Sequence, residues 1–449
     1  MADSGDPINR ARICIDFGTA LSKASMCLDA NLPLEVGVRT IPIGAVAGAT
    51  HHLLAPSVLF VDGGRLFFGP AALEHAQAGI SEGRDPILSF KTVLGAADVP
   101  AALAQRMPPS IDPTGTLRAR DALTLYLAYL DQLIREALRY AADVPPGIAD
   151  APRRYTSPVW KPGGGVDLAF EQIFNEAAAI SQKLGRLFLS PDGISIAQCK
   201  DALDKAASAP GNGHLETGIF EPHAAAAASL AFTSSPTRFV MVFDMGAGTT
   251  DIAAFDFDET SDPPSLTEVK PARQCSALAG DEIDRIIVEL ILRKRHAKDD
   301  DARAMRSLKL AAREMKKELF ATGKCQLKNG WISTTINAKD LADDEQFRGY
   351  QGALARLIAA SLGAVVQRAM QVGGGTVDVV LAGGGSHLPF LPNLVRHVAG
   401  NLPPNVTLRV GPLSPASSFY NTIDPALSST FPQIAMSVGG ALVERMAPA

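Results

Sequence analysis

Two stretches far apart in the chain share one pattern of apolar and polar positions. RICIDFGTALSKASMCL (12–28) and VMVFDMGAGTTDIAAFDF (240–257) each contain an apolar run that ends at an aspartate, a turn with Gly and Thr, and a second β-prone run. Apolar runs of strand length around a glycine turn predict antiparallel hairpins. The repetition predicts two halves of similar construction, each beginning with its own hairpin.

The rest of the chain alternates between helical and strand-like patterns. Apolar positions at helical spacing predict helices over 121–144, 170–185, 221–232, 280–298, 302–322 and 431–446. Strand patterns cover 153–160 and 377–382, and candidate junctions lie at 234–236 and 403–418, where Pro and Ser accumulate. This alternation is typical of an α/β fold.

Residues 352–372 are the most membrane-like stretch of the chain. The apolar residues recur at helical spacing, and Arg356, Gln367 and Arg368 lie between them. A helix with one apolar face and charges on the other is typical of a packed core helix and not of a membrane span.

Composition narrows the classes of function. The 449 residues are 47% hydrophobic and carry 42 Lys and Arg against 47 Asp and Glu, so the net charge of −5 gives no support to nucleic-acid binding. The five cysteines are scattered without a C-x-x-C pair, which argues against zinc sites and disulfide frameworks. Because the N-terminus has no apolar signal region, we expect a soluble, cytoplasmic protein without a membrane partner.

The turn GAGTTD (246–251) differs by one residue from the dinucleotide fingerprint G-x-G-x-x-G. A dinucleotide fold needs a helix directly after the glycines, but the residues that follow Gly248 are β-prone, so a hairpin is the better interpretation. Glycine turns can hold phosphate through backbone amides, Thr249 and Thr250 add hydroxyls, and Asp244 and Asp251 can hold a hydrated Mg²⁺. A tight hairpin without a ligand is the alternative, and the second, similar hairpin makes it less attractive.

A third stretch, VGGGTVDVVL (372–381), has a similar G-G-G-T-x-D order. It runs directly into the next strand, so we interpret its glycines as the end of the preceding helix and not as a phosphate turn.

Several motifs, in their order along the chain, resemble the actin/hexokinase/heat-shock ATPase superfamily. They are the two D-x-G-T-type hairpins, EPHAAAAASLAF (221–232) and VVLAGGGSHLP (379–389). Within that superfamily the chain looks most like the nucleotide-binding domain of the seventy-kilodalton heat-shock chaperones, on the stretches 56–72, 89–95, 279–289 and 309–320. The resemblance covers nearly the whole chain.

The resemblance implies an actin-like ATPase fold with two lobes, each a mixed sheet with flanking helices, and a nucleotide cleft between them. Lobe I would comprise 1–235 together with a closing helix in 417–449. Lobe II would comprise 236–416, with a smaller subdomain at about 276–334.

The resemblance also implies the roles of individual residues. The catalytic set would be Lys91, Asp16, Asp251 and Glu221, and the metal would be held by Asp16 and Asp244. Nucleotide would be bound by Gly18, Thr19, Asp244, Gly246, Gly248, Thr249, Thr250, Lys316, Lys317, Gly383, Gly384 and Gly385. Pro158 matches the proline that switches between lobe states.

Some positions depart from the family pattern. Ala20 stands where the family usually has a second threonine, and a lost hydrogen bond to a charged group costs about 1.5–3 kcal/mol at most. His387 stands where the chaperones carry an arginine near the adenine. The chain ends at Ala449, soon after the closing helix, so we expect no substrate-binding domain.

The expected function is a slow, Mg²⁺-dependent ATPase that acts as a nucleotide-driven conformational switch. It would bind ATP or ADP and a protein partner whose identity the sequence does not give. The alternatives are a nucleotide-binding pseudo-ATPase scaffold and a filament-forming, actin-like ATPase. A sugar or acetate kinase shares the superfamily, but no acceptor-site constellation is evident in the sequence.

Overall fold

The structure is a computed structural model of the 449-residue chain. It describes residues 7–157, 165–208, 215–216, 218–232, 237–261, 264–294, 302–328, 333–415, 427–442 and 447–448. Pro158, the predicted switch residue, and the first part of the predicted closing segment lie outside the described residues.

The first sheet is built around the first predicted hairpin. Its strands are β1 (Arg12–Asp16), β2 (Leu21–Cys27), β3 (Val38–Ile41), β7 (Arg153–Ser157) and β9 (Ile219–Phe220), with β4 (Ala55–Pro56) paired to β2. The order is β3-β2-β1-β7-β9, in which β1 and β3 each pair antiparallel with β2, and β7 and β9 are added in parallel. The hairpin at 12–28 is therefore confirmed.

The second sheet repeats this arrangement. It contains β10 (Phe239–Met245), β11 (Thr250–Asp258), β12 (Ser265–Glu268), β16 (Gly375–Ala382) and β17 (Val406–Pro412), with β13 (Gln274–Ser276) and β18 (Ala447–Pro448) at its edges. The order β12-β11-β10-β16-β17 has the same sequence of antiparallel and parallel pairings as the first sheet. A strand, and not a helix, follows GAGTTD, so the dinucleotide alternative is excluded.

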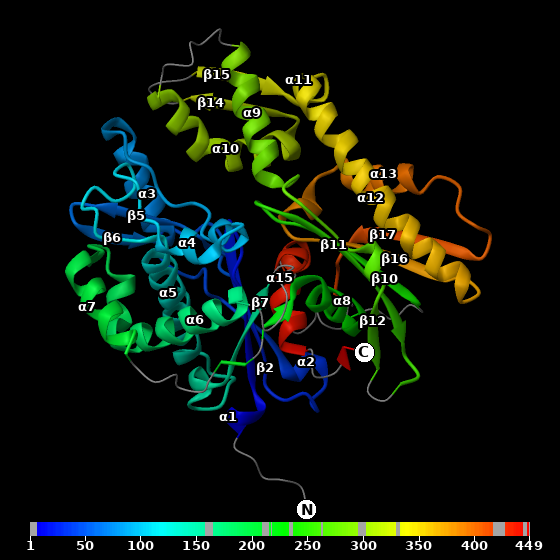
Figure 1. The fold of residues 1–449 in the computed structure, drawn as a ribbon, viewed down its shortest axis with the longest axis horizontal. Coiled ribbons are helices and arrows are strands. Elements are labelled where there is room, and N and C mark those ends of the chain that lie inside the picture. The colour runs from blue at the N-terminus through cyan, green and yellow to red at the C-terminus, as the bar shows by residue number, and fades with distance from the viewer. Residues whose placement is uncertain are drawn as a thin grey trace, which may run out of the picture.

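The first half surrounds its sheet with helices and a small satellite sheet. The helices are α1 (Pro7–Arg10), α2 (Leu34–Gly37), α3 (Gly69–Gly79), α4 (Val99–Ala104), α5 (Ala119–Arg139), α6 (Gly165–Leu184) and α7 (Ile196–Ala206). The satellite sheet consists of β5 (Leu59–Asp62), β6 (Arg65–Phe68) and β8 (Ile194–Ser195). The core of this half packs α5 and α6 together against the sheet (Figure 1).

The predicted helix over 121–144 ends earlier than expected. Helix α5 stops at Arg139, residues 141–147 form turns and bends, and the short helix η3 (Ile148–Asp150) follows. Asp143 in these turns accepts a hydrogen bond from Arg39 Nε at 3.0 Å, which links this segment to β3.

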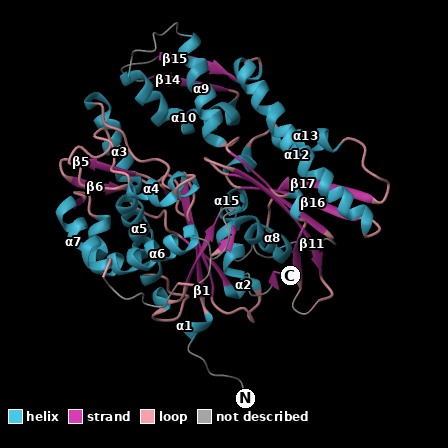
Figure 2. Cartoon of the chain, viewed as in Figure 1, coloured by secondary structure: helices cyan, strands magenta, loops and turns pink. Residues whose placement is uncertain are grey.

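The second half has its own helices and its own core. They are α9 (Gly280–Lys294), α10 (Ala302–Thr322), α11 (Ala338–Ala342), α12 (Glu345–Gln371) and α13 (Leu391–Ala399), with a hairpin of β14 (Lys324–Lys328) and β15 (Ser333–Asn337). Helices α9 and α10 lie with this hairpin at the end of the molecule next to α3 (Figure 2).

Helix α12 is the one helix among the described residues that is long and apolar enough to cross a membrane by length and composition. Its buried residues form one stripe at helical spacing: Phe347, Tyr350, Leu354, Ile358, Ser361, Leu362, Val365 and Ala369. This stripe faces the second core, as predicted for a one-faced core helix. The helix ends in the glycine stop that the sequence predicts, with Gly373 and Gly374 at positive φ before β16 begins.

Two helices join the halves. Helix α8 (Glu221–Phe232) packs on β10 and β11, and α15 (Leu427–Leu442) packs on β1, β2 and β7 as well as on α8. Their residues form a third core with the facing sides of both sheets. Small residues make this close packing possible, because a Cβ at Gly439 would overlap the Ala224 carbonyl of α8.

Candidate functional site

The tips of the two hairpins meet. A Cβ added at Gly248, in the second tip, would lie 3.2 Å from the side chain of Thr19, in the first. Asp16 ends β1, and Asp244 and Asp251 face each other in the register of β10 and β11. The structure therefore brings together the two motifs that the sequence places in opposite halves.

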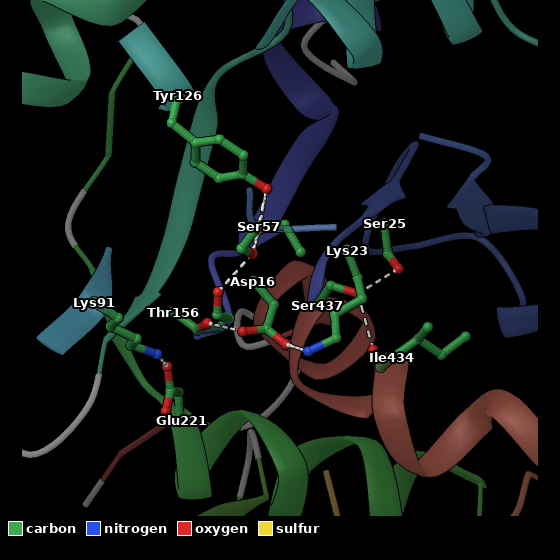
Figure 3. Close-up of polar contacts among 12 residues, drawn as sticks. Asp16, Lys23, Ser25, Ser57, Lys91, Tyr126, Thr156, Glu221, Ile434 and Ser437 are labelled. Atoms are coloured by element: carbon green, nitrogen blue, oxygen red, sulfur yellow. Dashed lines mark hydrogen bonds and ion pairs between the residues drawn. The ribbon is translucent and has the colours of Figure 1, made fainter. Parts of the chain in front are cut away.

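Asp16 is already paired within the protein. Its Oδ2 lies 2.8 Å from Lys23 Nζ, and its Oδ1 accepts a hydrogen bond from Thr156 Oγ1 at 3.1 Å (Figure 3). Neither partner of Asp16 is among the residues predicted from the sequence. A signal for Lys23 existed, because Asp16 and Lys23 are directly opposite in the hairpin register and such pairs share one face of the sheet. Thr156 comes from β7, whose register the sequence does not give.

Lys91 and Glu221 form a second buried ion pair. Lys91 begins the short helix η2 (Lys91–Gly95), Glu221 is the first residue of α8, and their side chains are in contact (Figure 3). Burial alone would lower the pKa of Lys91, but the charges of Glu221, Asp16 and Asp251 outweigh burial and raise it above its usual value. The ammonium group therefore stays charged, and the predicted pair of catalytic residues lies beside the hairpins.

Asp244 and Asp251 are the acids that lack such partners. Both are buried, and among the described residues each has an Oδ1 without a hydrogen-bond partner. Burial raises the pKa of Asp244 well above its usual value, and the charges of Glu221, Asp251 and Asp16 raise it further. A buried carboxylate oxygen without a partner is costly unless a ligand or a cation compensates it.

The charges of the acids and lysines around the two hairpin tips indicate what kind of ligand fits there. The two ammonium groups, of Lys23 and Lys91, neutralise Asp16 and Glu221. Asp244 and Asp251 would leave an uncompensated charge of about −2 when both are ionised, which matches a divalent cation with oxygen ligands. The residues present therefore fit Mg²⁺ at the second hairpin better than at Asp16.

The backbone of the second tip is oriented by α9. Gly280 N–H donates to the Gly246 carbonyl at 3.1 Å, and Asp281 N–H donates to the Ala247 carbonyl at 2.7 Å. In a trans peptide the C=O and the following N–H point in opposite directions. The amides of Ala247 and Gly248 therefore point away from α9, as a phosphate-binding turn requires.

The two threonines of this hairpin differ. Thr250 is buried at the start of β11, and its hydroxyl donates to the Leu278 carbonyl at 2.7 Å. In this structure the Thr250 side chain points inward and its hydroxyl is engaged, so its predicted contact with a ligand stays a prediction. Thr249 is exposed at the tip, and its carbonyl accepts from Gly246 N–H at 2.9 Å.

The predicted nucleoside side consists of the glycine turn and of α10. A Cβ at Gly383 (φ 71°) would overlap Asp244 Oδ1, and a Cβ at Gly385 would overlap the Met245 side chain, whereas Gly384 faces open space. The turn therefore packs closely on β10 beside Asp244. His387 ends the short helix η6 (Gly384–His387) and is exposed.

The two lysines of α10 that are predicted to bind nucleotide point in different directions. Lys316 Nζ lies 2.8 Å from the Gly280 carbonyl and 3.0 Å from Asp284 Oδ1, next to the second hairpin tip. Lys317 is exposed and pairs with Glu314 at 2.6 Å. Lys316 is therefore the member of the predicted pair that the structure brings to the site.

Two repeated sheets with opposed hairpins, joined by two central helices, define an actin-like ATPase fold. Comparison with known proteins shows which family within this class the chain resembles. Residues 216–409 match the family model described as Hsp70 protein. The match covers 194 of the 449 residues, and over this range the predicted resemblance to the seventy-kilodalton heat-shock chaperones is confirmed.

Individual relatives agree with the family match. Chaperone protein dnaK1 of Prochlorococcus marinus is 29% identical over 193 residues, which are 41% of this chain and 28% of the relative. Chaperone protein dnaK3 of a Synechocystis species is 29% identical over 181 residues, which are 38% of this chain and 23% of the relative. The similarity thus spans about a quarter of the length of these relatives.

Proposed function

We propose that the chain is a chaperone-like, Mg²⁺-dependent ATPase that hydrolyses ATP slowly and acts as a conformational switch. The observation that carries the proposal is the pair of buried acids, Asp244 and Asp251, with unpartnered oxygens where the two hairpin tips meet. The Hsp70-family match over 216–409 supports it, because this range contains both acids.

In this proposal Asp244 and Asp251 hold Mg²⁺ and its waters. The ion would neutralise charge on the phosphate oxygens. The role of Asp16 is then indirect, since Lys23 and Thr156 already occupy its carboxylate oxygens. Asp16 fixes the Lys23 ammonium under the first hairpin tip, where it attracts phosphate.

Backbone amides and Lys91 would position the phosphates and the attacking water. The amides of the tips at 18–20 and 246–249 would cradle the phosphates, and Lys91 would orient the attacking water or the γ-phosphate. Glu221 holds the Lys91 ammonium in position through their ion pair. Phosphoryl transfer of this kind depends on positioning and charge stabilisation more than on a strong base.

The nucleoside would lie between the turn at 383–385 and helix α10. Gly384 leaves space on the turn, and Lys316 lies beside Gly280 on the other side. We further propose that lobe I comprises 1–235 with the closing helix and that lobe II comprises 236–416. The angle between the lobes would report the bound nucleotide to a protein partner in the cytoplasm.

Phosphate release from ATP by the purified chain tests this function. We expect slow, Mg²⁺-dependent release that falls at least tenfold in Lys91→Ala and in Asp16→Asn, since charge stabilisation and positioning supply most of the rate. The control is Lys200→Ala, because Lys200 is an exposed lysine on α7 that pairs only with Asp204 among the described residues. Equal rates in all four proteins would contradict the assignment.

A pseudo-ATPase scaffold is the second candidate. Ala20 removes a hydroxyl from the first tip, and Lys23 occupies the carboxylate of Asp16. Calorimetric binding of ADP without measurable phosphate release would favour this candidate. ATP-dependent light scattering would instead favour the filament-forming alternative.

A further inference from the structure

Three buried hydroxyl groups lie directly behind the first hairpin tip. Ser22 Oγ is 3.1 Å from Ser57 Oγ and 3.2 Å from Tyr126 OH. Tyr126 OH is also 3.2 Å from Ser57 Oγ (Figure 3). All three residues are fully buried. They come from β2, from the residue after β4, and from α5, so this hydroxyl cluster exists only in the folded protein.

The direction of the hydrogen bonds follows from the acceptors. Ser57 Oγ lies 2.8 Å from the Gly18 carbonyl, and a carbonyl only accepts, so the Ser57 hydroxyl donates to it. The Ser57 oxygen is then left as the acceptor for Ser22 or for Tyr126. Tyr126 OH also reaches the Pro56 carbonyl at 3.2 Å. Each accepted bond strengthens the one that the hydroxyl donates.

Ser57 binds the tip twice. Its hydroxyl donates to the Gly18 carbonyl, and its backbone N–H donates to the Ala20 carbonyl at 2.8 Å. Because C=O and N–H are opposed in a trans peptide, the bond to the Gly18 carbonyl aims the Thr19 amide away from Ser57. This is the orientation that α9 gives to the second tip through the carbonyls of Gly246 and Ala247. The two tips therefore have different anchors for the same purpose.

Tyr126 also contacts the segments that carry the charged groups. Its ring stacks on Phe90, the residue before Lys91, at 4.5 Å between centroids and 15° between planes. It also lies 5.8 Å from Phe17, the residue after Asp16. One buried ring thus touches the first hairpin and the Lys91 segment.

We propose that Ser57 and Tyr126 are positioning residues that orient the first tip for phosphate. They bind no ligand themselves, and they act through the peptide between Gly18 and Thr19 and through the Phe90–Lys91 segment. This inference rests on the proposed nucleotide function for its consequence but not for its geometry.

The test uses Ser57→Ala and Tyr126→Phe, each with a matched control elsewhere in the core. Ser361→Ala removes an equally buried hydroxyl from α12, and Tyr129→Phe removes one from the same helix as Tyr126. The first readout is amide hydrogen exchange of a fragment that covers residues 16–21, in protein without nucleotide. The second is the Kd for MgADP, together with KM and kcat for ATP.

We expect faster exchange of this fragment in Ser57→Ala and a Kd and KM raised about five- to tenfold, the effect of one lost buried hydrogen bond. Tyr126→Phe would change them in the same direction and leave kcat unchanged, because Phe lacks the hydroxyl but keeps the ring that stacks on Phe90. The double variant would have the same Kd as Ser57→Ala, since Tyr126 acts on the tip through its hydrogen bond to Ser57. The controls would match the wild type in exchange and in Kd.

Unchanged exchange in Ser57→Ala and Tyr126→Phe would overturn the inference, as would equal changes in the control variants. Failure of the proposed function gives a different result. In that case the wild-type protein would not bind MgADP, while the exchange measurement would still decide whether Ser57 and Tyr126 hold the tip.

Discussion

Lys23 sets the charge balance of the first hairpin. Its ammonium and the Asp16 carboxylate are both buried, and a buried charge without a partner is costly. The family resemblance implies a metal held by Asp16 and Asp244, because the motif shows an acid before each glycine turn. The hairpin register shows that the same acid faces a lysine, and the remaining acids, Asp244 and Asp251, are the ligands that we propose for the metal.

Lys23→Met tests this balance. The variant leaves Asp16 buried without its cation, so we expect the free energy of unfolding to fall by about 3–5 kcal/mol. Adding Asp16→Asn to the same protein removes the charge and should restore most of the loss. Urea unfolding of the single and double variants measures both effects. A double variant as unstable as Lys23→Met would contradict the pairing.

At the scale of elements, the pattern of the chain predicts the two hairpins, most of the helices and the glycine stop after α12. It does so because these features depend on residues close together in sequence. The end of α5 was predicted too far along, since the contact between Asp143 and Arg39 is not local. The hydroxyl cluster around Ser57 and the hydrogen bond of Thr250 to Leu278 could not be predicted either, because they join elements that are distant in sequence.

A buried ion pair connects α5 with β7. Asp131 of α5 accepts from Arg153 of β7 at 3.0 Å and from Arg135 at 2.7 Å, with almost no exposure to solvent. Burial alone would raise the pKa of Asp131, but the charges of the two arginines outweigh it and hold the pKa below its usual value. Asp131→Asn should therefore destabilise the protein at pH 7 by about 3 kcal/mol, because Arg153 stays buried.

This effect depends on pH in a defined direction. A carboxyl group with a lowered pKa in the folded state stabilises the protein above its unfolded pKa of about 3.9. The stabilisation is lost as the pH falls through the lower folded pKa. The difference between wild type and Asp131→Asn in unfolding free energy should thus be full at pH 7 and shrink below about pH 4. The exposed partner variant Asp150→Asn should change little, and a difference independent of pH would contradict the ion pair.

At the scale of the whole molecule, the repetition in sequence corresponds to the two sheets with identical strand order. The contact between the halves far from the hairpins was not predictable from the pattern. Arg306 of α10 in the second half donates to Asp85 in the first half at 2.9 Å, and both side chains are partly exposed. This ion pair spans the two halves on the side where α10 lies.

The ion pair should slow opening of the two halves. Partly exposed pairs contribute about 0.2–1 kcal/mol, so Arg306→Ala should speed the release of bound ADP by about 1.5- to 5-fold. Stopped-flow displacement of a fluorescent ADP measures the rate. The charge swap Arg306→Asp with Asp85→Arg should return it toward the wild-type value, and a swap that releases ADP as fast as Arg306→Ala would argue against the pair.

We propose that a magnesium nucleotide binds where the two hairpins meet and that Asp244 and Asp251 hold the metal. Titration calorimetry of ADP, with Mg²⁺ and with the metal chelated, tests this proposal. We predict saturable binding to the wild type that weakens at least tenfold without Mg²⁺, and binding to Asp244→Asn and Asp251→Asn that no longer responds to the metal. Absence of ADP binding to the wild type, or an equal response to Mg²⁺ in all three proteins, would contradict it.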